Sequence, residues 1–298
     1  MNACVSILIP LLTCAAVAAQ PCTRPARPGL QGAFFAMDTA TQDERHRTVR
    51  RQAEMLRELG YEGYGPAWTA DLPGMLEVLD ELKLPLSAIY LVVTFDADGP
   101  RYDPAFAAHV PLLRGRGTVV WLVIRSAKRA APSPENDRAV VAVLRELADL
   151  LAAEGLRAAV YPHTGDYVAG HRDALRVVRA AERPNLGVSF NLCHWLKADG
   201  GGDPAPLLRE LRPHLLAVSI NGADREDPDF KDWSRFIRPL GEGDFDVGGL
   251  LKTLAQLGYD GPVGLQGYGL KGDVRVHLQR SMRAWREYQE RIGHDRGP

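Results

Sequence analysis

Short apolar segments alternate with longer amphipathic stretches along most of this chain. Short apolar runs bounded by turn residues are typical of strands that are buried on both faces. The chain contains eight such segments, at residues 32–37, 60–66, 86–95, 118–124, 157–161, 186–191, 215–221 and 262–266. The intervals between them are long enough to hold at least one helix each.

Helical periodicity fills several of these intervals. Residues 41–59 and 137–151 place apolar side chains on one face, close to the helical repeat. Asp246 is a predicted N-cap for a helix over residues 247–257, and Gly258 can end that helix. Eight strand–helix units with short links predict one α/β domain, a single (β/α)8 TIM barrel, rather than an open doubly wound sheet. No Gly-x-Gly-x-x-Gly motif opens a helix after the first segment, which disfavours a dinucleotide-binding fold.

Four consecutive predicted strands end in uncharged polar residues. These residues are Tyr161, Asn191, Asn221 (with Ser219 two positions before it) and Gln266. The carboxyl ends of barrel strands form the open mouth where ligands bind, so these side chains are expected to converge there. His163 and His194 follow two of the same strands and are expected at the same mouth.

Composition and charge exclude some partners. The chain has 298 residues, with 46% hydrophobic and 24% charged positions and a formal net charge of -1. This balance is ordinary for a globular protein with a sizeable core. A net charge this small provides no overall field to attract nucleic acid or an anionic membrane.

The N-terminal segment resembles a secretory signal. The first 22 residues carry no charged side chain, and an apolar run at residues 5–12 precedes small residues that suit signal peptidase. The sequence predicts a signal peptide over residues 1–19, a disordered Pro-rich linker over residues 20–30 and the barrel over residues 31–298. The mature protein is therefore expected in the periplasm or outside the cell, without a membrane anchor.

Two cysteines remain after the predicted cleavage, Cys22 and Cys193. A disulfide between them is one reading in an oxidising compartment. A buried free thiol at Cys193 is the favoured reading, because cysteine is among the most often buried residues.

Two sequence patterns carry a family resemblance. The first is Gly-Glu-Gly-Asp-Phe-Asp at residues 241–246, followed by Gly-Tyr-Asp-Gly at residues 258–261. The second is Leu-Arg-Glu-Leu-Gly-Tyr at residues 56–61. Together they resemble the xylose isomerase-like TIM barrels, over roughly residues 32–290. That superfamily includes sugar and sugar-phosphate isomerases and epimerases, inosose dehydratases and endonuclease IV, so the resemblance implies a small sugar or polyol as the partner.

The resemblance also implies a metal site whose ligands this chain lacks. In the family, Glu, Asp, His and Glu from four consecutive strands hold a divalent cation. The matching positions here are Tyr161, Asn191, Ser219 (or Asn221) and Gln266. Divalent cations prefer carboxylate oxygen or imidazole nitrogen, so we expect no metal cofactor.

The expected chemistry is metal-independent acid/base catalysis. The predicted catalytic residues are His163, His194 and Tyr161, because imidazole and phenol groups can exchange protons. The predicted substrate-binding residues are Asn191, Asn221, Gln266, Trp195 and Lys197. Trp195 can stack on a sugar ring or belong to the core, and Lys197 can bind an anionic group or be solvated.

Three functional hypotheses remain at this stage. The favoured one is an isomerase, epimerase or lyase that acts on a sugar or polyol derivative. The alternative is a non-catalytic carbohydrate-binding protein derived from an isomerase. An abasic-site nuclease is disfavoured, because it requires a metal cluster rich in His and carboxylate ligands and a basic groove.

Overall fold

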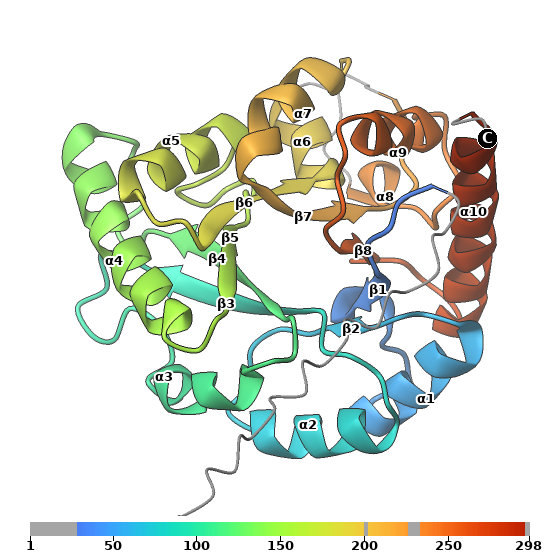
Figure 1. The fold of residues 1–298 in the computed structure, drawn as a ribbon, viewed down its shortest axis with the longest axis horizontal. Coiled ribbons are helices and arrows are strands. Elements are labelled where there is room, and N and C mark those ends of the chain that lie inside the picture. The colour runs from blue at the N-terminus through green and yellow to red at the C-terminus, as the bar shows by residue number, and fades with distance from the viewer. Residues whose placement is uncertain (1–28, 200–201, 226–232, 296–298) are drawn as a thin grey trace, which may run out of the picture.

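Eight parallel strands form a nearly closed barrel surrounded by helices (Figure 1). The computed structural model describes residues 29–199, 202–225 and 233–295. The strands are β1 (Phe34–Met37), β2 (Tyr64–Gly65), β3 (Ala88–Thr94), β4 (Val119–Arg125), β5 (Arg157–Val160), β6 (Leu186–Asn191), β7 (Leu215–Ile220) and β8 (Val263–Leu265). Their order around the sheet is β2-β1-β8-β7-β6-β5-β4-β3. The single (β/α)8 barrel predicted from the sequence is confirmed.

The barrel closes between β2 and β3 through isolated bridges. Parallel bridges pair Tyr64 with Leu86 and Ala67 with Tyr90. The second strand is shorter than the predicted segment 60–66, because Gly60 ends helix α1 in a left-handed conformation with φ of 86°. Glycine adopts this conformation without the steric cost that a side chain would add.

The helices follow the strands in sequence. They are α1 (Val49–Leu59), α2 (Leu72–Glu81), α3 (Ala105–His109), α4 (Pro134–Ala152), α5 (His171–Ala181), α6 (Leu192–Asp199), α7 (Ala205–Leu211), α8 (Trp233–Phe236), α9 (Val247–Gln256) and α10 (Val274–Asp295), with short 3-10 turns at Asp38–Ala40, Val110–Leu113 and Arg212–His214. Asp246 caps α9 as predicted, since its side chain accepts a hydrogen bond of 2.8 Å from the Gly249 N–H. Helix α1 is shorter than the predicted stretch 41–59, because Thr48 caps it and the residues before form a turn and loop.

Two separate clusters of buried side chains make up the core. The larger one lies between the strands and the surrounding helices. The smaller one fills the inside of the barrel with residues that include Phe35, Trp121, Val123 and Tyr161. These large side chains plug the barrel below its mouth, so a ligand can enter only at the carboxyl ends of the strands.

The predicted N-terminal segments lie mostly outside the described residues. The signal peptide over residues 1–19, the start of the linker and Cys22 belong to that part, so export stays a prediction. The linker prediction is wrong at its end, because Leu30 is buried and its N–H donates a hydrogen bond of 2.6 Å to Gln289 Oε1 on α10. Within the described ranges, no helix is long and apolar enough to cross a membrane.

Candidate functional site

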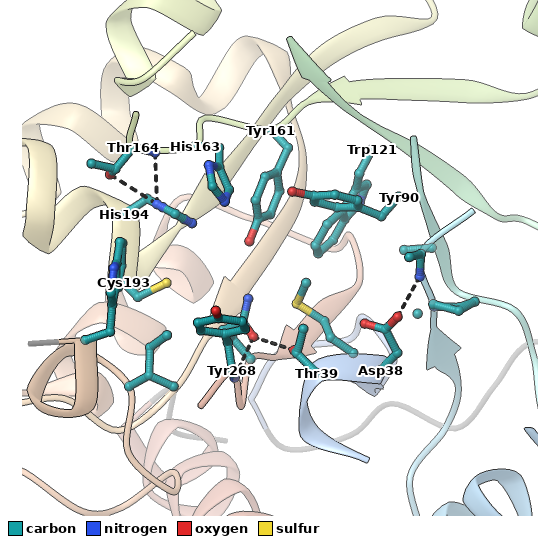
Figure 2. A pocket seen from close by; sticks show the side chains of 18 of the residues that line it. Asp38, Thr39, Tyr90, Trp121, Tyr161, His163, Thr164, Cys193, His194 and Tyr268 are labelled. Carbon is teal, nitrogen blue, oxygen red and sulfur yellow. Dashed lines mark hydrogen bonds between the residues drawn. The ribbon is translucent and has the colours of Figure 1, made fainter. Parts of the chain in front are cut away.

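A cavity of about 500 Å³ opens at the carboxyl ends of the strands. This size suits a small molecule such as a sugar. Figure 2 shows aromatic rings and two histidines along one side and Asp38, Thr39 and Tyr268 along the other. Four of the predicted site residues line it: Tyr161, His163, His194 and Gln266.

His163 is held by a carboxylate behind it. Its Nδ1 lies 2.9 Å from Asp166 Oδ2, and the Arg125 guanidinium donates a hydrogen bond of 3.1 Å to the same oxygen. Burial raises the pKa of Asp166, but the hydrogen bonds from His163 and Arg125 outweigh it and hold that pKa below the ordinary value. An ionised Asp166 keeps the ring proton on Nδ1 and leaves Nε2 of His163 as an acceptor.

His194 differs from His163 in which ring nitrogen carries the proton. It stands in the first turn of α6, and its Nδ1 accepts a hydrogen bond of 3.0 Å from the Thr164 N–H. Burial lowers the pKa of His194 to about 3, with further lowering from the charges of His163 and His171. The ring is therefore neutral at ordinary pH and carries its proton on Nε2. Its free nitrogen is therefore a donor, and the predicted catalytic role of His194 stays a prediction.

The two histidines are direct neighbours. Their ring centroids lie 4.3 Å apart, and both rings reach the same side of the cavity (Figure 2). One ring offers a lone pair and the other an N–H. The pair can thus accept a proton from one atom of a ligand and donate a hydrogen bond to a neighbouring atom.

Tyr161 lies at the floor of the cavity. Its ring stacks on Trp121 with centroids 5.1 Å apart and meets Tyr90 edge-on. Its hydroxyl makes no hydrogen bond to a described residue. Burial raises the pKa of Tyr161 well above its ordinary value, although the Ser219 and Gln266 side chains act in the opposite direction. The phenol therefore keeps its proton, and a ligand oxygen is a suitable acceptor for it.

Gln266 is oriented by donors that bind its oxygen. Gln266 Oε1 accepts hydrogen bonds from the Thr39 hydroxyl, from the Gly267 N–H at 2.9 Å and from the Tyr268 N–H at 3.0 Å. An amide whose oxygen is occupied in this way has its NH₂ group free to act as a donor. Gln266 lines the cavity, and its side chain acts to lower the pKa of Tyr161. We therefore assign its Nε2 to the cavity side.

Asp38 is a carboxylate on the opposite side of the cavity. It follows β1, and its Oδ2 accepts a hydrogen bond of 2.9 Å from the Ala67 N–H. Burial raises the pKa of Asp38, and hydrogen bonds from the Ala67 and Thr39 backbone only partly oppose this. In Figure 2 its other oxygen points toward the cavity.

The two asparagines do not line the cavity. Asn191 is fully buried, and its Oδ1 accepts a contact of 3.3 Å from the Cys193 thiol. The Asn221 amide nitrogen donates to the backbone carbonyls of Gly222 and Phe236, at 2.7 and 2.6 Å. Asn191 Nδ2 and Asn221 Oδ1 are buried without a hydrogen-bond partner among the described residues, so a substrate-binding role for these amides stays a prediction. Cys193 is buried and free, as favoured from the sequence.

Trp195 and Lys197 also lie outside the cavity lining. Trp195 is 4% exposed and packs against Phe190 and Phe245, so it belongs to the core. The Lys197 ammonium lies 5.1 Å from the centre of the Phe236 ring. The packing of Trp195 agrees with the core alternative left open from the sequence, whereas anion binding by Lys197 stays a prediction.

Sequence reasoning missed several residues of the cavity wall. Tyr90, Trp121 and Arg125 line it. Arg125 ends β4, so the rule that identified the other strand ends could have found it. Tyr90 and Trp121 sit inside apolar strands, where alternation alone does not reveal which face is inward.

The residues at the family's metal positions do not fit a divalent cation. Tyr161, Asn191, Ser219 and Gln266 supply a phenol, an amide, a hydroxyl and a second amide, without a carboxylate or imidazole. Among the described residues, no three His, Cys, Asp or Glu side chains gather where they could hold a metal ion. Neutral oxygens of this kind bind hard cations weakly.

Comparison with known proteins identifies the family. The family model described as "Xylose isomerase-like TIM barrel" matches residues 114–288. The chain belongs to this family. It is 33% identical to a 3-dehydroshikimate dehydratase of Pseudomonas aeruginosa over 125 residues, which is 41% of this chain but only 19% of that protein's length.

Solved structures share the fold at low sequence identity. An L-ribulose 3-epimerase superposes with a TM-score of 0.68 and 14% identity, covering 89% of this chain and 96% of that one. A structure of IOLI protein with a bound zinc atom gives a TM-score of 0.69 and 17% identity, covering 87% and 99%. These similarities establish the xylose isomerase-like fold for this chain.

Proposed function

We propose that this protein is a sugar isomerase/epimerase-like enzyme that removes a proton beside the carbonyl group of a small hydroxyketone. Its relatives include an epimerase and a dehydratase. Isomerisation, epimerisation and elimination of water beside a ketone can all begin with loss of a proton from the carbon next to the carbonyl. The common first step, rather than one of the final products, is what the cavity residues of this chain support.

The observation that carries the proposal is the pair of adjacent histidines with opposite ring states. His163 Nε2 accepts the proton from the substrate carbon, and Asp166 stabilises the imidazolium that forms. The electron pair of the broken C–H bond moves to the carbonyl oxygen, which becomes an enolate. The His194 ring lies beside the His163 ring, with a distance of 4.3 Å between the two centroids, and its Nε2–H donates a hydrogen bond to that oxygen.

Two further donors support the enolate oxygen. Gln266 Nε2 and the Tyr161 hydroxyl are further hydrogen-bond donors in the cavity lining. Donors fixed in advance around a developing negative charge stabilise it without reorganisation, and each is worth on the order of a hundredfold in rate. Return of the proton to a carbon gives an isomer or epimer, whereas departure of a β-hydroxyl group with a proton gives an elimination product.

The mechanism proposed here uses no metal. Hydrogen-bond donors take the part that a cation would play in polarising the carbonyl group. The donor set described above supports this, because Tyr161 and Gln266 supply an O–H and an N–H group at the two positions where the family has metal-binding Glu residues. The substrate is proposed to be a small sugar or a related ketone, in keeping with the epimerase among the structural neighbours.

Exchange of hydrogen for deuterium tests the proposed step directly. The purified protein is incubated in D₂O and chelator with free ketoses and with 3-dehydroshikimate, and NMR follows deuterium entry beside the carbonyl. We expect exchange for at least one compound, and His163→Gln is expected to lower its rate by roughly a hundredfold or more. His46→Gln is the matched control, because His46 Nδ1 lies 2.8 Å from Asp43 in a similar pair away from the cavity.

Three outcomes would contradict the proposal. Tight binding of a sugar without exchange of any compound would favour a carbohydrate-binding protein. Equal rates in wild type and His163→Gln would exclude His163 as the base. Loss of exchange in chelator, with recovery on addition of Mn²⁺ or Zn²⁺, would show that the reaction requires a metal.

A further inference from the structure

Asp38 gives the cavity a second feature, which the proposed proton transfer does not use. Building on the proposed function, we infer that Asp38 restricts the ligand to uncharged polyhydroxy ketones. Its carboxylate accepts hydrogen bonds from hydroxyl groups at the end of the ligand that lies away from the histidines. The same charge repels ligands that carry a carboxylate or phosphate group.

The position of Asp38 is fixed by the backbone. It opens the 3-10 turn Asp38–Ala40 directly after β1, and the Ala67 N–H after β2 binds one of its oxygens at 2.9 Å. Figure 2 shows the carboxylate across the cavity from His163 and His194, with the second oxygen directed inward. That oxygen is available to a ligand, and a carboxylate in such a place requires donors.

The charges of the cavity wall leave Asp38 uncompensated. Arg125 is the one cationic Lys or Arg side chain among the described lining residues, and its guanidinium is paired with Asp166 at 3.1 Å. Burial raises the pKa of Asp38, and only backbone N–H groups act against it, with no cation contributing.

The geometry of the cavity determines how strongly neutral ligands should be preferred over anionic ones. A ligand whose carbonyl group reaches the histidines extends its other end toward Asp38, because the two lie on opposite sides. An anionic group held about 6 Å from the carboxylate, at an effective dielectric constant of about 20, binds on the order of a hundredfold more weakly than a neutral group. Hydroxyl groups at the same place gain a charge-assisted hydrogen bond instead.

Calorimetry on matched ligand pairs tests this inference. The full chain is titrated with D-allulose and D-ribulose and with the 6-phosphate of the first and the 5-phosphate of the second. We expect wild type to bind at least one neutral ketose more tightly than its phosphate, by about tenfold or more. Asp38→Asn keeps the shape and the acceptor for Ala67, and it should reduce that preference by about tenfold or more, mainly by strengthening phosphate binding.

The controls separate this inference from the proposed catalysis. Asp98→Asn removes one negative charge from a side chain that is 96% exposed outside the cavity lining, and it should leave the preference unchanged. The His163→Gln variant should keep the preference even if it has lost exchange, since binding requires no proton transfer. A wild type that prefers the phosphates or binds none of the neutral ketoses would overturn the inference, as would an unchanged preference in Asp38→Asn.

Discussion

The neutral state of His194 makes protein stability depend on pH in a defined way. Burial lowers the pKa of His194 from 6.5 to about 3 in the folded protein. In the unfolded chain the same ring binds a proton below about pH 6.5. Between these values the unfolded state holds one more proton than the folded state, so acidification favours unfolding.

The size of the effect follows from the displaced pKa. For each unit of pH below the pKa of His194 in the unfolded chain, the free energy of unfolding falls by about 1.4 kcal/mol. This continues until the ring also takes up a proton in the folded protein. His194 alone therefore lowers the free energy of unfolding by about 2 kcal/mol between pH 7 and pH 5. Its contribution is unaffected above about pH 7 and continues to fall toward pH 3.

Urea denaturation of wild type and His194→Gln at pH 7 and pH 5 measures this contribution. Glutamine does not titrate and can still accept the Thr164 N–H, while all other groups titrate alike in the two proteins. On acidification from pH 7 to pH 5, the free energy of unfolding of wild type is expected to fall by about 2 kcal/mol more than that of the variant. NMR of the ring nitrogens should show the proton on Nε2 of His194 at both values of pH. Equal losses in the two proteins, or a His194 ring that titrates near pH 6 in the folded state, would refute the assignment.

Three further predictions concern the cavity. Tyr161→Phe removes a buried hydroxyl without a described partner, so urea denaturation should show unchanged stability or a gain of about 1 kcal/mol, while the exchange rate falls on the order of a hundredfold. A clear loss of stability would show that the hydroxyl is bound in the folded protein. Gln266→Glu replaces a donor with a carboxylate oxygen and should lower the exchange rate on the order of a hundredfold, with Gln289→Glu on α10 as the control. Elemental analysis of protein dialysed against chelator should find well under one metal ion per chain, with exchange retained; stoichiometric metal would contradict the metal-free proposal.

The fold could be predicted from the sequence because buried strands are directly recognisable as apolar segments. Strands that are covered on both faces read as continuous apolar runs, and all eight segments were recognisable on that basis. Parallel strands in register also bring their carboxyl ends to one edge. Tyr161, His163 and Gln266 could be placed together for that reason alone.

The side chains that were misplaced depend on features that an apolar run does not encode. Helix α6 begins at Leu192, immediately after β6, so successive residues point about 100° apart around a helix instead of continuing the strand. His194 thus reaches the cavity while Trp195 turns to Phe245 in the core. Asn191 and Asn221 lie outside the cavity lining, and each amide makes hydrogen bonds within the protein through one of its two polar atoms, which only the folded chain can show.

The positions of the carboxylates explain how a member of this family could work without a cation. The four strand ends that would hold a metal present neutral groups, whereas the ionised Asp166 lies behind His163. On the proposed mechanism, the negative charge supports an imidazolium rather than a metal ion, and it acts only while the proton is on His163. A carboxylate at Gln266 would instead face the enolate oxygen and oppose it. On this proposal the neutral residues at the strand ends and the charge behind His163 are parts of the same electrostatic arrangement. A single carboxylate introduced at the cavity should therefore weaken the proposed catalysis rather than produce metal-dependent chemistry.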